Sequence, residues 1–166
     1  YDVQRLGVER QGRTPFTEVT AYGESCGTPR FSRDGKELVF IDTDGRSEFA
    51  VKVLDTASRK VVQKFDIRGG SGADFTPDAR YIVYGGAAMW RTFYRFHDLY
   101  VRHRASGKVR RLTDGLRARD PAVSPRGGRV AFTSNELGTM SLMVVPFDGG
   151  AARVLIKGDA GDQFYT

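Results

Sequence analysis

The sequence predicts an all-β chain that forms part of a β-propeller made of four-stranded antiparallel blades. Twenty of its 166 residues are glycine, and short runs rich in Val, Phe and Tyr lie between glycine-containing turns. No window carries apolar residues at helical spacing. A related phrase recurs at Ser32, Thr76 and Ser124, at spacings of 44 and 48 residues, close to the period of about 40–45 residues of a propeller blade.

Each repeat predicts four strands. In the first repeat they are expected at Arg30–Ser32, Glu37–Ile41, Phe49–Leu54 and Val61–Phe65. The strand at Glu37–Ile41 is apolar on both faces, which indicates burial on both sides, as when propeller blades pack face to face. The second and third repeats follow the same order.

We expect three complete blades and a partial blade at each end. The partial blades are residues 1–27, with strands at Tyr1–Gly7 and Thr14–Ala21, and residues 160–166. The complete blades are residues 28–68, 69–115 and 116–159. Propellers typically have about 4–8 blades, so the sequence is interpreted as one segment of a larger ring.

The hairpin turns of the repeats differ in one respect. Asp34-Gly35 in the first repeat and Gly127-Gly128 in the third supply residues that tolerate a positive φ. Ala79 stands at the turn glycine's position in the second repeat, and Arg126 stands where Asp is expected in the third. The sequence therefore does not fix the geometry of the second hairpin.

Charge and cysteine content narrow the function classes only slightly. The net charge is +6, but the cations are spread along the chain, which favours solvated outer strand faces over a nucleic-acid groove. The single Cys26 cannot form an internal disulfide. No stretch approaches the roughly 20 apolar residues of a membrane span, so no integral membrane segment is expected.

The repeated phrase resembles a known family. Phe31 to Phe40, FSRDGKELVF, is similar to the F-S-P-D-G-K-x-I-A-F phrase of TolB-type, WD40-like propeller repeats, as is Val123 to Ser134. Val144 to Gly150 resembles the V-x-D-x-x-G-G ending of such repeats. The resemblance covers Thr28 to Asp159. It implies a six-bladed parent ring and a periplasmic or cell-envelope setting in a bacterium.

A possible nucleophile motif is best interpreted as structural. Gly23 to Gly27, GESCG, matches the G-x-S-x-G elbow, which requires a helix after the serine. Here Thr28 to Phe31 predicts a strand, and His97 and His103 are the only histidines. We interpret the motif as a glycine-rich loop between blades.

Two further motifs lack the residues that their chemistry needs. Asp42 to Gly45, with Glu48, lacks the ligand spacing of an EF-hand and predicts a polar hairpin loop. Gly69 to Gly72 is not followed by Lys-Ser/Thr and a helix, so it predicts a flexible link between blades rather than a phosphate loop. We expect no metal and no cofactor.

The loop expected at Gly85 to His97 is the main departure of the second repeat. It is longer than its counterparts and rich in Trp, Tyr and Arg, the residue types enriched at interaction hot spots. The candidate partner-binding residues are Trp90, Arg91, Phe93, Tyr94 and His97. The alternative is that these aromatic residues extend the two strands and pack against the next blade.

The functional hypothesis is a non-enzymatic, TolB-like propeller scaffold that binds a protein or peptide partner. No catalytic residues are identified in this segment, and no nucleic acid is expected. The alternative is an accessory propeller domain of a larger serine hydrolase or peptidase that gates substrate access. A third possibility, hydrolysis by metal-bound water in the parent ring's channel, is disfavoured by the scarcity of histidine.

Overall fold

The computed structural model describes residues 25–43, 48–90, 94–136 and 138–159, with the side chains of Trp90 and Tyr94 left aside. The strands expected at Tyr1–Gly7 and Thr14–Ala21 lie outside these residues. The described strands, in chain order, are β1 (Ser25–Phe31), β2 (Glu37–Thr43), β3 (Phe49–Asp55), β4 (Lys60–Ile67), β5 (Gly70–Phe75), β6 (Tyr81–Trp90), β7 (Tyr94–His103), β8 (Val109–Arg111), β9 (Ala118–Val123), β10 (Arg129–Ser134), β11 (Ser141–Pro146) and β12 (Arg153–Ile156).

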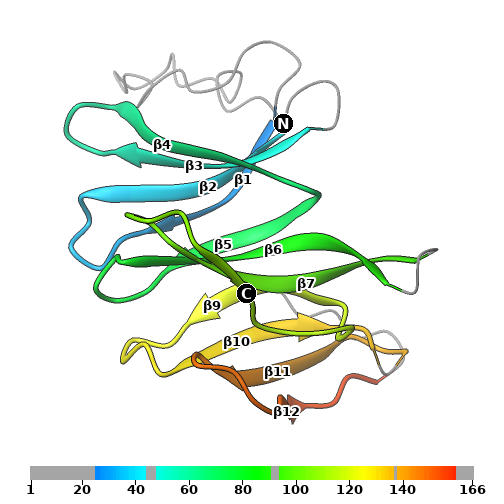
Figure 1. Cartoon of the computed structure of the whole chain (residues 1–166). Coiled ribbons are helices and arrows are strands. Elements are labelled where there is room, and N and C mark those ends of the chain that lie inside the picture. Colours follow the sequence, from blue (N-terminus) through cyan, green and yellow to red (C-terminus); the bar gives the residue numbers. More distant parts are fainter. Residues whose placement is uncertain (1–24, 44–47, 91–93, 137, 160–166) are drawn as a thin grey trace, which may run out of the picture.

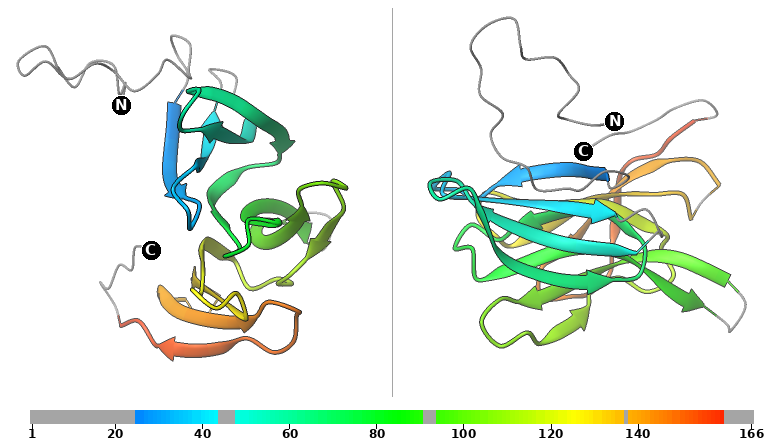
Figure 2. Two further views of the ribbon diagram at one scale, coloured as in Figure 1. Left: turned by 90° about the vertical axis from the view of Figure 1, so that its left-hand side faces the viewer. Right: turned by 90° about the horizontal axis from the view of Figure 1, so that it is seen from above.

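These strands form three four-stranded antiparallel sheets, each a simple meander in chain order. The first sheet holds β1 to β4, the second β5 to β8 and the third β9 to β12 (Figure 1). The first strands of the sheets, β1, β5 and β9, lie next to one another, and the sheets fan outward from them (Figure 2). This is the arrangement of consecutive propeller blades about an axis, and it confirms the predicted fold class.

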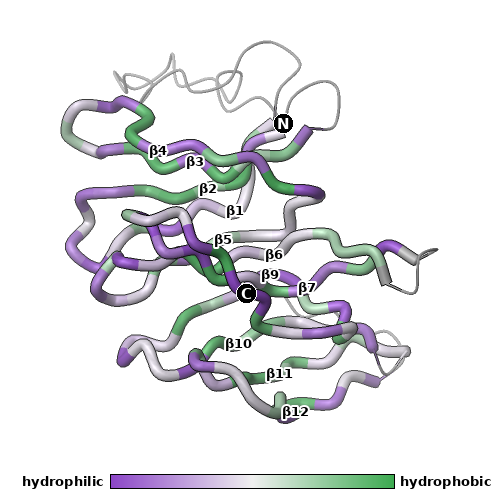
Figure 3. Tube along the Cα trace, in the orientation of Figure 1, coloured by the Kyte–Doolittle hydropathy of each residue, from purple (hydrophilic) through white to green (hydrophobic). Residues whose placement is uncertain are grey.

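Two apolar interfaces hold the three blades together. Blades one and two meet through side chains of β2, β3 and β4 packed against β5 and β6, and blades two and three meet through β6 and β7 packed against β9, β10 and β11. Val39, Phe40 and Ile41 are all buried, so β2 is covered on both faces as predicted. Hydrophobic positions accordingly follow the middle strands of each blade (Figure 3). Residues of the two interfaces include Val51, Val53, Phe75, Ile82, Leu99, Val101, Val130, Phe132 and Val145.

The second hairpin keeps the geometry of the other two, although alanine stands at the position of the turn glycine. Ala79 has a φ of 52°, and its N–H donates to the Thr76 carbonyl at 2.8 Å. Gly35 and Gly127, at the equivalent positions, have φ values of 71° and 75° and make the same bond within their turns. The surrounding turn therefore holds an alanine in a conformation that ordinarily costs an L-residue about 1–2 kcal/mol.

Two glycine-rich segments expected as loops between blades are strands. Gly70 to Gly72 lies in β5, and Ser25 to Gly27 lies in β1. A Cβ atom on Gly70 would lie 2.6 Å from Cγ2 of Ile41, so the absence of a side chain lets β5 approach the first blade closely. Asp42 and Thr43, expected in a polar loop, are likewise the last residues of β2. Residues 44–47 of that expected loop lie outside the described residues.

The missing aspartate of the third turn leads to a stability prediction. Asp34 Oδ1 accepts a hydrogen bond from Ser32 Oγ at 2.7 Å, and this bond is the main reason that its pKa is lowered. In the second blade, Oδ1 of Asp78 likewise accepts a hydrogen bond from Thr76 Oγ1. Since Arg126 occupies this position in the third blade, Arg126→Asp is expected to raise the urea concentration at the midpoint of unfolding at neutral pH.

The pH dependence of that gain follows from the direction of the shift. A carboxylate whose folded-state pKa is lowered stabilises the fold above its unfolded pKa, about 3.9, and the gain disappears as the pH falls through the folded value. Arg126→Ala removes the arginine without adding an acceptor and is the matched control. If Arg126→Ala stabilised the chain equally, the predicted hydrogen bond would not be the cause.

Candidate functional site

The hairpin of β6 and β7 is the longest in the described part of the chain. Each of its strands has 10 residues, against 7 for β2 and β3 and 6 for β10 and β11. Pairing runs without interruption from Tyr81↔His103 to Trp90↔Tyr94. The prediction of a loop from Gly85 to His97 was therefore wrong for most of these residues, because they extend β6 and β7.

The small residues from Gly85 to Ala88 were interpreted as part of a loop, but they lie within β6. A Cβ atom on Gly86 would lie 3.4 Å from the Tyr100 ring, and one on Gly85 would lie 1.9 Å from Ser71 Oγ. Small residues here therefore accommodate larger neighbours on β7 and β5 rather than forming a turn. The alternation of aromatic and basic side chains from Tyr94 to His97 is the signal that could have revealed the second strand.

The structure places the five candidate binding residues in different ways. Trp90 and Tyr94 are paired strand residues whose side chains are not described, and Arg91 and Phe93 lie outside the described residues. His97 is half-buried on β7, opposite Ala87. The proposal that the five form a binding surface therefore stays a prediction.

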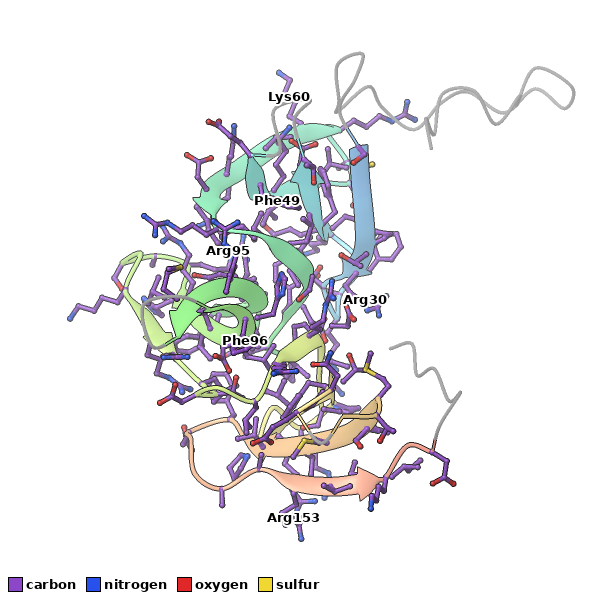
Figure 4. The ribbon with its side chains drawn as sticks, turned by 90° about the vertical axis from the view of Figure 1, so that its right-hand side faces the viewer. Arg30, Phe49, Lys60, Arg95, Phe96 and Arg153 are labelled. Atoms are coloured by element: carbon purple, nitrogen blue, oxygen red, sulfur yellow. The ribbon has the colours of Figure 1, made fainter. Side chains whose placement is uncertain are left out.

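Exposed side chains that the sequence reasoning did not select as binding residues lie beside these candidates. Met89, near the end of β6, is 57% exposed, and its cross-strand partner Arg95 is also exposed. Figure 4 looks onto the end of the molecule from which the hairpin projects, with Arg95 and Phe96 labelled on β7. Phe96 contacts the next blade's entry loop, because the guanidinium carbon of Arg117 lies 4.3 Å from its ring centroid. The packing alternative thus holds for Phe96.

His97 lies in a positively charged environment. Burial lowers the pKa of His97, and the neighbouring guanidinium groups of Arg119 and Arg95 lower it further, while Asp98 opposes them. A Cβ atom on Gly69 would lie 3.3 Å from Nε2 of His97, so the imidazole packs against the link between the first two blades. A neutral imidazole is the favoured form in this setting.

Next to His97, a buried carboxylate ties blade two to the segment that leads into blade three. Asp98 is fully buried, and its Oδ2 accepts bonds from Arg111 Nη2 at 2.6 Å and from the Gly115 N–H at 3.0 Å. Its Oδ1 accepts bonds from Thr113 Oγ1 at 2.8 Å and from the Leu116 N–H at 3.3 Å. With four donors this carboxylate is a structural anchor.

The inner strands bring charged residues together near the axis. A cavity of only about 10 Å³ is lined there by Thr28, Arg30, Gly72, Ala73, Asp120 and Pro121. Burial raises the pKa values of Asp74 and Asp120, although Arg30 acts on both carboxyl groups in the opposite direction. Asp74 Oδ2 also accepts a bond from the Val123 N–H at 2.7 Å, which joins blades two and three. Space for about one water makes this a packed junction.

The described residues do not assemble the nucleophile motif into a catalytic group. Ser25 and Cys26 lie on β1, and burial, with the nearby Asp42, raises the pKa of the Cys26 thiol. His103, on β7, pairs through Nδ1 with Ser106 Oγ at 2.8 Å. Within the part of the chain that the structure covers, no three His, Cys, Asp or Glu side chains gather as metal ligands. A search of the same residues for a helix able to cross a membrane finds none.

Comparisons with known proteins support the fold. No family model matches the chain, and no curated protein matches it. Among solved structures, TolB from Acinetobacter baumannii aligns over 80% of this chain with a TM-score of 0.64 and 20% identity. The chain has a TolB-like β-propeller fold. The chain spans 32% of the length of that TolB chain.

Other propeller structures align with the chain at similar TM-scores. A prolyl endopeptidase structure aligns over 82% of it, with a TM-score of 0.62 and 16% identity, and the match covers 22% of the endopeptidase chain. A structure of a nidogen/laminin complex aligns over 80% of it, with a TM-score of 0.64 and 17% identity, and 48% of that chain is covered. At these identities the likeness concerns the fold.

Proposed function

We propose that the chain belongs to a non-enzymatic propeller scaffold that binds a protein or peptide partner at the end formed by the β6–β7 hairpin. The observation that carries the proposal is the extension of this hairpin beyond those of the other two blades, with Met89 and Arg95 exposed on it. Exposed apolar and guanidinium groups on a continuously paired hairpin suit partner binding, because paired strands need little ordering on association.

The candidate contact residues are Trp90, Arg91, Phe93, Tyr94 and His97. The resemblance to TolB-type repeats supports a bacterial periplasmic or cell-envelope setting for this scaffold. One solved propeller similar to the chain comes from a nidogen/laminin complex, which is consistent with a protein as the partner.

Aromatic truncation at the hairpin end tests the proposal. Peptides selected on the immobilised chain should bind Trp90→Ala/Tyr94→Ala at least about tenfold more weakly in fluorescence anisotropy, because aromatic residues dominate binding energy at hot spots. Trp90→Phe/Tyr94→Phe is the matched control and should retain most of the affinity. The melting temperature should be unchanged. A lower melting temperature with unchanged affinity would show that these side chains pack against the scaffold instead.

A second candidate function is that of an accessory domain that gates access to a serine hydrolase. The alignment of the chain with a prolyl endopeptidase structure over 82% of its length favours it. A catalytic domain with its own Ser, His and Asp residues, encoded in the same reading frame, would decide for this second function. The likeness in fold alone does not distinguish the two, since propellers carry many functions.

A further inference from the structure

Four arginine residues lie at the end of the molecule that carries the β6–β7 hairpin. This arginine cluster consists of Arg68 between β4 and β5, Arg95 on β7, Arg117 before β9, and Arg119 on β9. The charges of Arg95 and Arg119 both lower the pKa of His97. The guanidinium group of Arg117 stacks on the ring of Phe96, the residue between Arg95 and His97. The backbone carbonyl of Arg68 accepts a bond from the N–H of Ala87, the cross-strand partner of His97.

The positive charge of the cluster is not neutralised by ion pairs. In the part of the chain that the structure covers, none of the four guanidinium groups has a carboxylate within 4.0 Å. By contrast, Arg104 forms an ion pair with Glu37, and Arg111 forms one with Asp98. Arg68, Arg95 and Arg119 are also exposed. Among the described residues, these guanidinium groups therefore have no ion-pair partner within 4.0 Å.

Apolar surface accompanies these charges. Met89 is 57% exposed opposite Arg95, and the Phe96 ring lies under the guanidinium group of Arg117. Such a surface offers planar donors for carboxylates together with contact area for an apolar side chain. It runs from the third strand of blade two to the first strand of blade three.

We infer that the arginine cluster is the docking site for a short acidic segment of a protein partner, with an apolar residue of that segment on Met89. This inference rests on the proposed partner-binding function and specifies the partner's chemistry. Charge complementarity supports it, since free guanidinium groups pair with carboxylates in bidentate geometry.

The neighbouring charges favour an acidic peptide over a nucleic acid. Asp120 follows Arg119 on the inner strand β9, and the charge of Arg119 acts on its carboxyl group, so the positive surface ends at this strand. Single-stranded nucleic acid needs a basic groove that follows its backbone over several nucleotides. A cluster of four cations bounded by a carboxylate suits a short segment instead.

Charge reversal provides the test. The cluster variant is Arg95→Glu/Arg117→Glu/Arg119→Glu, and the matched control is Lys60→Glu/Lys108→Glu/Arg153→Glu, which changes the net charge equally. Lys60 and Arg153 lie at the margins of the molecule, away from Arg95 (Figure 4). The probes are a fluorescein-labelled peptide of Asp, Glu and Leu, its analogue with Asn and Gln, and oligothymidylate.

The acidic peptide should bind the full chain more tightly than the uncharged analogue, and less tightly as salt is added. We expect the cluster variant to weaken binding at least about tenfold and the control variant to change it less than about threefold. Arg95→Gln/Arg119→Gln alters exposed positions only and should weaken binding about threefold even if the triple variant folds poorly.

Three results would overturn the inference. They are equal binding of the uncharged analogue, equal loss in both triple variants, and tighter, cluster-dependent binding of oligothymidylate. If peptides selected on the chain depend on Trp90 and Tyr94 but lack Asp and Glu, the proposed function stands and the acidic preference fails. If neither the probes nor selected peptides bind, both fail.

Discussion

Replacing Asp98 with alanine is expected to lower the free energy of unfolding by about 3–5 kcal/mol. The Asp98 carboxylate is fully buried and accepts bonds from Arg111, Thr113 and two backbone N–H groups. Its removal leaves the Thr113 hydroxyl and the two backbone N–H groups without this acceptor, whereas Arg111 keeps Asp114. Each unsatisfied buried group costs about 1–3 kcal/mol. Urea denaturation of the wild-type and variant chains measures the difference.

A matched control comes from the other carboxylate that contacts the same arginine. Asp114 Oδ1 lies 2.8 Å from Arg111 Nη2, but the Asp114 side chain is 77% exposed. Asp114→Ala should therefore cost less than about 1 kcal/mol, as for other surface ion pairs. Asp98→Asn, which keeps the size and one acceptor oxygen, should fall between the two. Similar losses for Asp98→Ala and Asp114→Ala would show that burial does not govern this network.

The fold could be predicted because its repeats share a local turn chemistry. Ser32, Thr76 and Ser124 each receive backbone N–H bonds from the strand that follows, so the same residue type recurs once per blade. Even Ala79 did not disturb the turn, since the hydrogen bonds around it hold its positive φ. Repeated local contacts of this kind are visible in a sequence without knowledge of the tertiary structure.

The roles of the glycines in β5 could not be predicted, because they depend on neighbouring blades. The sequence around Gly70 and Gly72 looks like a flexible link, yet both residues are needed where β5 approaches Ile41 and Asp120. A glycine that permits close approach is the same residue as a glycine that permits a turn, and only tertiary contacts separate them.

The arginine cluster was missed for a related reason. Arg68, Arg95 and Arg119 are widely spaced in the sequence, and the topology of the blades brings them to one end. The cations appear dispersed when the chain is taken in order, which led to the expectation of solvated outer faces. Arg91, the one arginine among the predicted binding residues, lies outside the described residues.

Replacing Gly72 with alanine is expected to lower the free energy of unfolding by about 2–4 kcal/mol. Gly72 has a φ of 135°, a conformation that residues with a Cβ atom rarely adopt. A Cβ atom there would also lie 3.2 Å from the Cα of Asp120 on the first strand of the next blade. Because the obstacle is backbone on an inner strand, relief requires blades two and three to move apart. Thermal unfolding should show a melting temperature lower by several degrees.

Gly128 provides the contrast that isolates this effect. A Cβ atom on Gly128 would meet no atom within 4 Å, and Gly128 lacks a positive φ. Gly128→Ala should therefore leave the free energy of unfolding within about 0.5 kcal/mol, or raise it slightly, because alanine reduces the conformational entropy of the unfolded chain. Since both variants add one methyl group to a glycine, a difference between them measures the strain of the inner strand and its contact with Asp120. Equal effects would mean that the approach of β5 to β9 does not limit the packing of blades two and three.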